Sequence, residues 1–287
     1  MANLKEIRSR ITSVGSTMQI TSAMKMVSAA KLKRAQDAIT QMRPYANKLT
    51  ELLEKVSATL DSSGGGVYAQ ERKVTNVLFV TITSNRGLCG GFNAYIIKRA
   101  KTLIDEEYTN ANVNILSIGK KSTEHFNKNG FNIIGDHDSL FADLNFENVS
   151  EIAQRIMQQY VCGDYDKVVL IYNQFKNAAT QIVMTENFLP ITRNEKKEIA
   201  IEDYIFEPTK QEIVDQLIPK SLKTQLFKAV LDSHAAEHGA RMTAMHKATD
   251  NAGELKKELT LTYNKARQAA ITGEILEIVG GAEALNG

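Results

Sequence analysis

The sequence predicts an α/β protein: a long antiparallel coiled coil of N- and C-terminal helices with an inserted Rossmann-like three-layer α/β domain. Both ends of the chain carry helical periodicity, the middle alternates β-branched strands with helical stretches, and a glycine-rich segment marks one change between the two patterns. We expect an N-terminal coiled-coil helix over 1–60, a linker over 61–72, the Rossmann-like domain over 73–207 and a C-terminal coiled-coil helix over 208–287.

The N-terminal helix is predicted by a heptad frame that runs from Leu4 to Leu60 without a phase slip. Such a helix would be about 85–90 Å long at ~1.5 Å per residue. Polar side chains interrupt the seam only at Thr21, Lys25 and Ser28, and Pro44 should kink the helix. The heptad positions are Leu4, Ile7, Ile11, Val14, Met18, Thr21, Lys25, Ser28, Leu32, Ala35, Ile39, Met42, Ala46, Leu49, Leu53, Val56 and Leu60.

The middle of the chain changes period after the linker signal DSSGGG at 61–66. Short β-branched runs then alternate with helical stretches, a pattern that predicts a parallel sheet with helices on its faces. A last run adds an antiparallel edge strand. We expect strands at 74–83, 113–118, 131–134, 167–172 and 180–188, and helices at about 92–107, 120–129 and 148–161.

The C-terminal helix should present a face of small residues, because alanine recurs every fourth position from Ala240 to Ala252. We expect that stripe to continue through Leu255, Leu259, Thr262, Ala266 and Ala269, and to end in Ile271, Ile275, Ile278, Ala282 and Leu285. Since both long helices begin or end at the same insert, they should pair antiparallel, with large N-terminal side chains packed on these alanines.

Composition excludes several classes of protein. A net charge of +2 gives no argument for nucleic acid or lipid, and no apolar run approaches the ~20 residues that span a bilayer. Two cysteines, Cys89 and Cys162, form no disulfide framework and no zinc spacing, so we expect a reducing compartment. Residues 1–60 nevertheless hold ten basic and four acidic side chains. This basic stretch is either a solvated helix face or a surface for an acidic partner.

The sequence motifs that could form a catalytic, phosphate-binding or metal-binding site are weak. The turn SNRGLCGGFN at 84–93 could offer backbone N–H groups to a phosphate, but it matches neither GxGxxG nor a P-loop, so a tight strand-to-helix turn is favoured. Cys89 has no histidine beside it in sequence. His234 and His238 stand at i, i+4 without an HExxH motif. We therefore expect no catalytic residue, no cofactor and no metal.

Three segments resemble the γ subunits of F-type ATP synthases. They are residues 17–36 (TMQITSAMKMVSAAKLKRAQ), residues 240–285 (ARMTAMHKATDNAGELKKELTLTYNKARQAAITGEILEIVGGAEAL) and the 84–93 turn, where that family usually has Asp in place of Asn85. The resemblance implies a non-catalytic, rotating central stalk. Its partners would be the α, β and ε subunits and the membrane c-ring, with neither nucleic acid nor direct membrane insertion, and ion flow would drive ATP synthesis.

The resemblance also implies roles for individual residues. The segment Met24, Lys25 and Met26 would meet an acidic part of the β subunit, which supplies a partner for the basic stretch. A second contact with β would use Arg267, Gln268 and Thr272. The apolar tip running in the bearing of the α/β ring would comprise Ile275, Ile278, Val279, Ala282 and Leu285. A foot close to ε and the c-ring would include Tyr204 and Glu207.

The same resemblance places the chain at the cytoplasmic face of the bacterial inner membrane, as a peripheral subunit. It favours a bacterial type. The matching sequence starts near Met1, which argues against an organellar type, and residues 163–287 contain no cysteine, which argues against the chloroplast type. A stand-alone coiled-coil adaptor or tether with a ligand-binding α/β domain is the main alternative, and a nucleotide-binding enzyme is a third.

Overall fold

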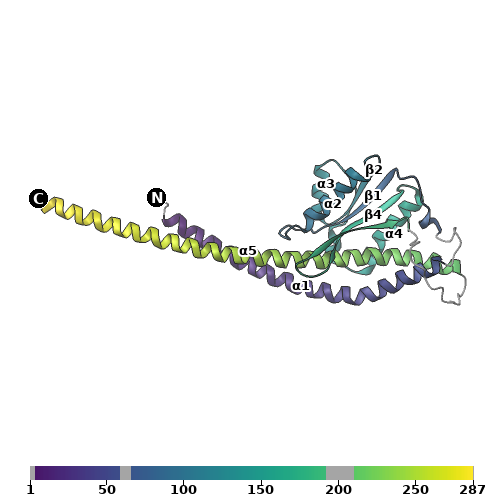
Figure 1. Cartoon of the computed structure of the whole chain (residues 1–287), viewed down its shortest axis with the longest axis horizontal. Coiled ribbons are helices and arrows are strands. Elements are labelled where there is room, and N and C mark those ends of the chain that lie inside the picture. Colours follow the sequence, from purple (N-terminus) through teal and green to yellow (C-terminus); the bar gives the residue numbers. More distant parts are fainter. Residues whose placement is uncertain (1–3, 59–65, 192–209, 287) are drawn as a thin grey trace. The chain divides into compact units, whose positions relative to one another are not determined.

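A computed structural model describes residues 4–58, 66–191 and 210–286 (Figure 1). The chain divides into two compact units. We call residues 1–28 with 242–287 the helical unit, and residues 29–241 the sheet unit. The elements are α1 (Leu4–Ala58), the 3-10 helix η1 (Gly66–Ala69), β1 (Asn76–Ile82), α2 (Phe92–Glu106), β2 (Asn112–Ile118), α3 (Lys120–Lys128), β3 (Asn132–Asp136), the 3-10 helix η2 (Asp138–Ala142), α4 (Phe146–Cys162), β4 (Lys167–Phe175), β5 (Gln181–Leu189) and α5 (Lys210–Asn286).

The five strands form one sheet in the order β3-β2-β1-β4-β5. The first four are parallel and β5 is an antiparallel edge strand, as predicted. Central β1 pairs on both sides, so that Val80 lies opposite Leu116 of β2 and Leu170 of β4. Six of its seven residues are buried, which fits a run of apolar β-branched residues covered on both faces.

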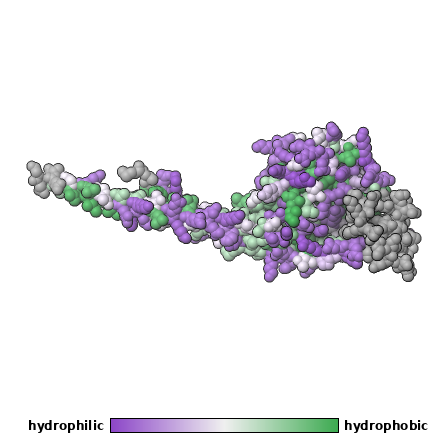
Figure 2. Space-filling view, in the orientation of Figure 1, coloured by the Kyte–Doolittle hydropathy of each residue, from purple (hydrophilic) through white to green (hydrophobic). Residues whose placement is uncertain are grey.

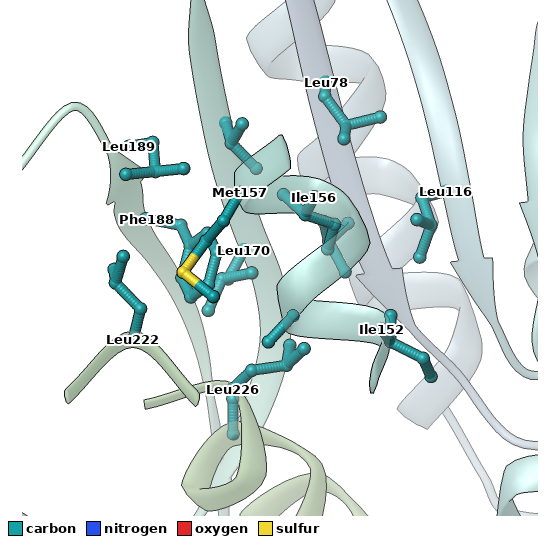
Figure 3. Close-up of a cluster of buried hydrophobic side chains, with 14 of the residues drawn as sticks. Leu78, Leu116, Ile152, Ile156, Met157, Leu170, Phe188, Leu189, Leu222 and Leu226 are labelled. Atoms are coloured by element: carbon teal, nitrogen blue, oxygen red, sulfur yellow. The ribbon is translucent and has the colours of Figure 1, made fainter. Parts of the chain in front are cut away.

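Helices cover both faces of this sheet, which gives the predicted three layers (Figure 1). On one face α4 and the sheet-unit part of α5 pack over β1, β2, β4 and β5 in the main apolar cluster (Figure 3). On the other face α2 and α3 bury Ile96, Leu103 and Phe126. The residues of the cluster labelled in Figure 3 are Leu78, Leu116, Ile152, Ile156, Met157, Leu170, Phe188, Leu189, Leu222 and Leu226.

The ends of α4 show how local sequence sets an element. Its N-cap is Asn145, whose side-chain oxygen accepts a hydrogen bond of 2.8 Å from the backbone N–H of Asn148. The helix ends at Gly163, which has φ +85° and is left-handed, a conformation that glycine adopts without a steric penalty. The sequence prediction had started this helix two residues late and had not identified the two 3-10 helices.

The long helices agree with the prediction where the structure describes them. Helix α1 continues through Pro44, and α5 continues through Pro219. Every described heptad position of α1 is buried or half-buried up to Leu49. The predicted domain boundaries remain predictions, since the start of the linker, residues 61–65, and the change near 207 lie outside the described residues.

Candidate functional site

In the helical unit, α1 and α5 pair in opposite directions. The Thr249 hydroxyl donates to the Thr21 hydroxyl at 2.8 Å, and the Lys25 ammonium lies 3.3 Å from Nδ1 of His246. Towards the N-terminus, Gly15 faces the side chain of Lys256. The contacts towards the N-terminus of α1 thus fall at increasing residue numbers on α5. The two helices are therefore antiparallel, as the sequence predicted.

The seam that α5 contributes differs from the prediction. Leu255 is 45% exposed, and Thr262 and Ala269 are also exposed. Ala252, Leu259 and Ala266 are covered as predicted, whereas the position between each of them lies one residue further along the helix. This phase of the 3-4 spacing keeps one stripe of α5 against α1. The absence of a side chain at Gly15 leaves room for one of the covered residues, Lys256. These positions are Met245, Thr249, Ala252, Lys256, Leu259, Tyr263, Ala266, Ala270 and Gly273.

The predicted contact residues all lie in the helical unit. Met24 and Lys25 are half-buried beside α5, whereas Met26 is 65% exposed and points away from the seam. Arg267, Gln268 and Thr272 are exposed on α5. None of the three is on the seam, so their side chains are available to another molecule.

The predicted tip is an apolar surface that no other described part of the chain covers. Ile275 is 54% exposed, Ile278 71% and Val279 50%, and Leu276, which the sequence reasoning missed, is 65% exposed. Figure 2 shows this apolar surface near the C-terminal end of α5. Burying such side chains is worth about 1.5–3 kcal/mol each, so their exposure indicates a binding surface. Ala282 is exposed, and the Leu285 side chain, Tyr204 and Glu207 lie outside what the structure describes.

In the sheet unit, the turn at 84–93 is internally hydrogen-bonded. Asn93 accepts from the backbone N–H of Ser84 at 3.0 Å and donates to the Ser84 hydroxyl at 2.8 Å. Cys89 is 1% exposed, and burial raises the pKa of its thiol. A buried, protonated thiol is a poor nucleophile, so the structure favours a packing role for Cys89.

Asn85, the position at which the resemblance departs from the family pattern, bridges two elements. Its amide nitrogen donates to the Asp138 carbonyl at 2.7 Å, and its oxygen accepts from the Lys120 backbone N–H at 3.0 Å. An ionised carboxylate could make only the second of these bonds, because it has no hydrogen to donate. Asparagine therefore ties the turn both to η2 and to the start of α3.

The carboxyl ends of β1 and β4, where open α/β sheets bind ligands, are covered by α5. The Ser233 hydroxyl donates to the Ile82 carbonyl at 3.3 Å, and Gly239 packs on Ala178. Arg241 donates to the carbonyl oxygens of Arg86 (3.2 Å) and Gly87 in the turn. A phosphate site needs free N–H groups at this edge, and here the turn directs two carbonyls at an arginine.

Arg241 also forms a buried ion pair with Glu237. Its Nη2 lies 2.6 Å from Glu237 Oε1, and the two side chains are only 10% and 11% exposed. Burial raises the pKa of Glu237, while the hydrogen bond from Arg241 opposes that shift. Apart from a Glu and an Arg at i, i+4, no sequence signal predicts this contact.

His234 and His238 meet next to this ion pair. Their Nε2 atoms are 3.1 Å apart, and the His234 ring stacks on Phe141 with centroids 5.7 Å apart. Burial lowers the pKa of His234 to about 4 and that of His238 to about 3. Within the described ranges no group of three or more His, Cys, Asp or Glu residues could hold a metal ion. No helix described there is long and apolar enough to cross a membrane.

These features define a class of coiled-coil subunits with an inserted Rossmann-like domain. They are the paired terminal helices, the exposed apolar tip, and a sheet whose ligand-binding edge is covered by α5. The chain matches the ATP synthase family model over residues 3–285. It is 64% identical to the ATP synthase gamma chain of Flavobacterium johnsoniae, with 100% of both chains covered, and 55% identical to that of Cytophaga hutchinsonii, again with 100% of both covered. The chain therefore belongs to the ATP synthase gamma chain family.

Solved structures agree with this assignment. The central stalk and c-ring structure of the Tetrahymena thermophila mitochondrial ATP synthase includes a chain that is 27% identical, with a TM-score of 0.60 over 80% of this chain and 99% of that one. The rotor of the Euglena gracilis mitochondrial enzyme gives a TM-score of 0.69 over 93% and 98% at 20% identity, which supports the fold alone. The function of the family is that of the central stalk of a rotary F-type ATP synthase.

Proposed function

We propose that the chain turns inside a ring of α and β subunits and thereby couples ion flow through a membrane c-ring to ATP synthesis or hydrolysis, without catalysing a reaction itself. The observation that carries the proposal is the tip. The α1–α5 seam ends near Gly273, and the exposed isoleucines beyond it need an apolar socket outside the chain. A ring of partner subunits supplies such a socket.

The contacts in this proposal are those that the resemblance implies. Met24, Lys25 and Met26 meet an acidic segment of β, and Arg267, Gln268 and Thr272 form a second contact with β. The tip, including Ile275, Ile278, Val279, Ala282 and Leu285, runs in the apolar bearing of the ring. Tyr204 and Glu207 belong to a foot beside ε and the c-ring. The complex is peripheral at the cytoplasmic face of the inner membrane.

Reconstitution tests the proposal directly. The chain is mixed with α and β subunits from the same source, and complex mass and ATPase activity are measured together. We expect one copy of the chain per ring and turnover that depends on its addition. A stable free protein that associates with neither subunit would instead support the adaptor or tether alternative.

Reversal of charge at Lys25 tests the contact with β. We expect Lys25→Glu to lower ATP-driven ion pumping per ATP hydrolysed by about fivefold or more, because like charges then face each other across a contact. The measurement compares pumping and hydrolysis in reconstituted membranes.

The Lys25 experiment needs two controls. Lys33→Glu makes the same charge change at an exposed position of α1 and should leave the coupling ratio unchanged. Because Lys25 also contacts His246, Lys25→Gln separates loss of that contact from charge reversal. Unchanged coupling in a folded Lys25→Glu complex would exclude this residue from the contact.

A further inference from the structure

An open groove runs between α2 and α3 on the sheet-unit face opposite α4. Its volume is about 600 Å³. The two helices lie side by side over the same face of the sheet (Figure 1). The α2 wall extends from Asn93 to Asp105, and Lys121, Glu124 and His125 form the α3 wall. At ~1.5 Å per residue, the α2 wall is about 18 Å long, or roughly three helical turns.

The lining of the groove is amphipathic. Ala94 and Ile97 provide apolar surface near the N-terminal part of α2, and Lys98 and Lys101 follow one turn further on. The aliphatic stems of such lysines add apolar area while their ammonium groups reach solvent. An apolar floor with charged groups along its sides is the form of groove that receives an amphipathic helix.

The residues that line the groove carry more positive than negative charge. The Lys121 ammonium is paired with Glu124 at 2.5 Å. Lys98 and Lys101 make no ion pair with any described residue. Desolvation lowers the pKa of His125, and the positive charges of Lys101 and Lys128 lower it further. The lining thus holds three lysines against two carboxylates, Asp105 and Glu124, and keeps one net positive charge, to which the nearby Lys128 adds.

We propose that the α2–α3 groove is a docking site for an acidic amphipathic helix of a partner polypeptide. The apolar stripe of that helix packs on Ala94 and Ile97, and its carboxylates face Lys98 and Lys101. The open, elongated form of the groove suits a helix of about three turns. A small anion would leave most of the apolar floor exposed. Neither the tip nor the β-contact residues belong to this surface.

Photo-cross-linking in the assembled complex tests the proposal. A photoreactive amino acid replaces Ala94 in the groove or, as a control position, exposed Glu151 on α4, and cross-linked peptides are identified by mass spectrometry. We expect the groove position to capture a segment with Asp or Glu at helical spacing, and the control position not to. Absence of a polypeptide cross-link above the control, or capture of a basic segment, would overturn the proposal.

Charge variants make the test specific. Lys98→Glu with Lys101→Glu should reduce the cross-link about tenfold, since charges of the same sign would then meet. Lys73→Glu with Lys176→Glu makes the same net change at two exposed lysines outside the groove and should leave the yield unchanged. An equal yield in both double variants would show that the groove lysines do not recognise the partner.

A direct binding measurement completes the experiment. A helix-stapled acidic peptide with an apolar stripe, and its counterpart with every Glu changed to Lys, are titrated into the full chain by fluorescence anisotropy. We expect the acidic peptide alone to bind, less tightly at high salt. Equal binding of both peptides would contradict charge recognition, and displacement of the complex's own cross-link by ATP or by anionic lipid vesicles would assign the groove to those ligands instead.

Discussion

Arg241→Ala is expected to lower the free energy of unfolding of the sheet unit by about 3–5 kcal/mol, the usual cost of removing one partner from a buried ion pair. The substitution leaves the Glu237 carboxylate in a site where its side chain is only 11% exposed. It also takes a donor from the carbonyls of Arg86 and Gly87. Glu237 can escape part of the penalty by taking up a proton, because burial already raises its pKa.

Chemical denaturation of the full chain at neutral pH, followed by a tyrosine signal from the sheet unit, measures this loss. The control is the double variant Glu237→Leu with Arg241→Met, which removes both charges and retains apolar volume. We expect it to be more stable than Arg241→Ala, since no charge is left buried without a partner. A single variant as stable as the wild type would mean that Arg241 does not anchor the turn.

The regular elements of the fold were predictable because their signals are local. Strand β1 carries a β-branched run bounded by polar residues, and the turn at Gly163 stops α4 through its own backbone freedom. The heptad frame of α1 was likewise readable, since each large apolar side chain on it marks the seam. These signals depend on the residue itself and not on what packs against it.

The prediction for the α5 seam was wrong at every second position, because two neighbouring stripes carry similar residues. Leu255 suggested one phase, whereas Lys256 and Tyr263 occupy the other and pack through their long side chains. Only the partner helix decides between them, and Gly15 of α1 leaves space for Lys256. The hydrophobicity pattern of α5 alone contains no information about the space that α1 leaves for each of its side chains.

The candidate site shows a similar limit. The contact and tip residues could be assigned by resemblance, and the structure adds that Met26 and the tip isoleucines are exposed. The anchoring of the 84–93 turn by Arg241 joins residues more than 150 positions apart. No local motif predicts such a contact. Only the tertiary structure therefore shows that α5 covers the carboxyl ends of β1 and β4, where open α/β sheets bind ligands.

Acidification from pH 7 to pH 5 is expected to destabilise the sheet unit through His234 and His238. Their pKa values are about 4 and about 3 in the folded chain, against about 6.5 when unfolded. The unfolded chain therefore binds more protons than the folded chain below pH 6.5, and stability falls as pH falls through that window. At pH 5 the loss is about 2 kcal/mol for each histidine, or about 4 kcal/mol together.

The surroundings of His234 and His238 explain why the pKa values of both side chains are lowered. Burial is the largest cause of both shifts, and the positive charge of Lys31 on α1 lowers both pKa values further. The charges of His234 and Arg241 also lower the pKa of His238, while the Phe141 ring stacks on His234. Nδ1 of His238 is buried and has no hydrogen-bond partner among the described residues, so a proton there would be poorly solvated. The nearby carboxylate of Glu237 is already engaged by Arg241.

The measurement is the free energy of unfolding at pH 7 and pH 5 for the wild type and for His234→Phe with His238→Leu. Comparing the two proteins cancels the titration of other groups, including Asp232 and Glu237, whose raised pKa values act in the opposite direction. We expect the variant to lose about 4 kcal/mol less than the wild type between these two pH values. Equal losses would show that neither imidazole is held neutral by the fold, whatever the stability of the variant at pH 7.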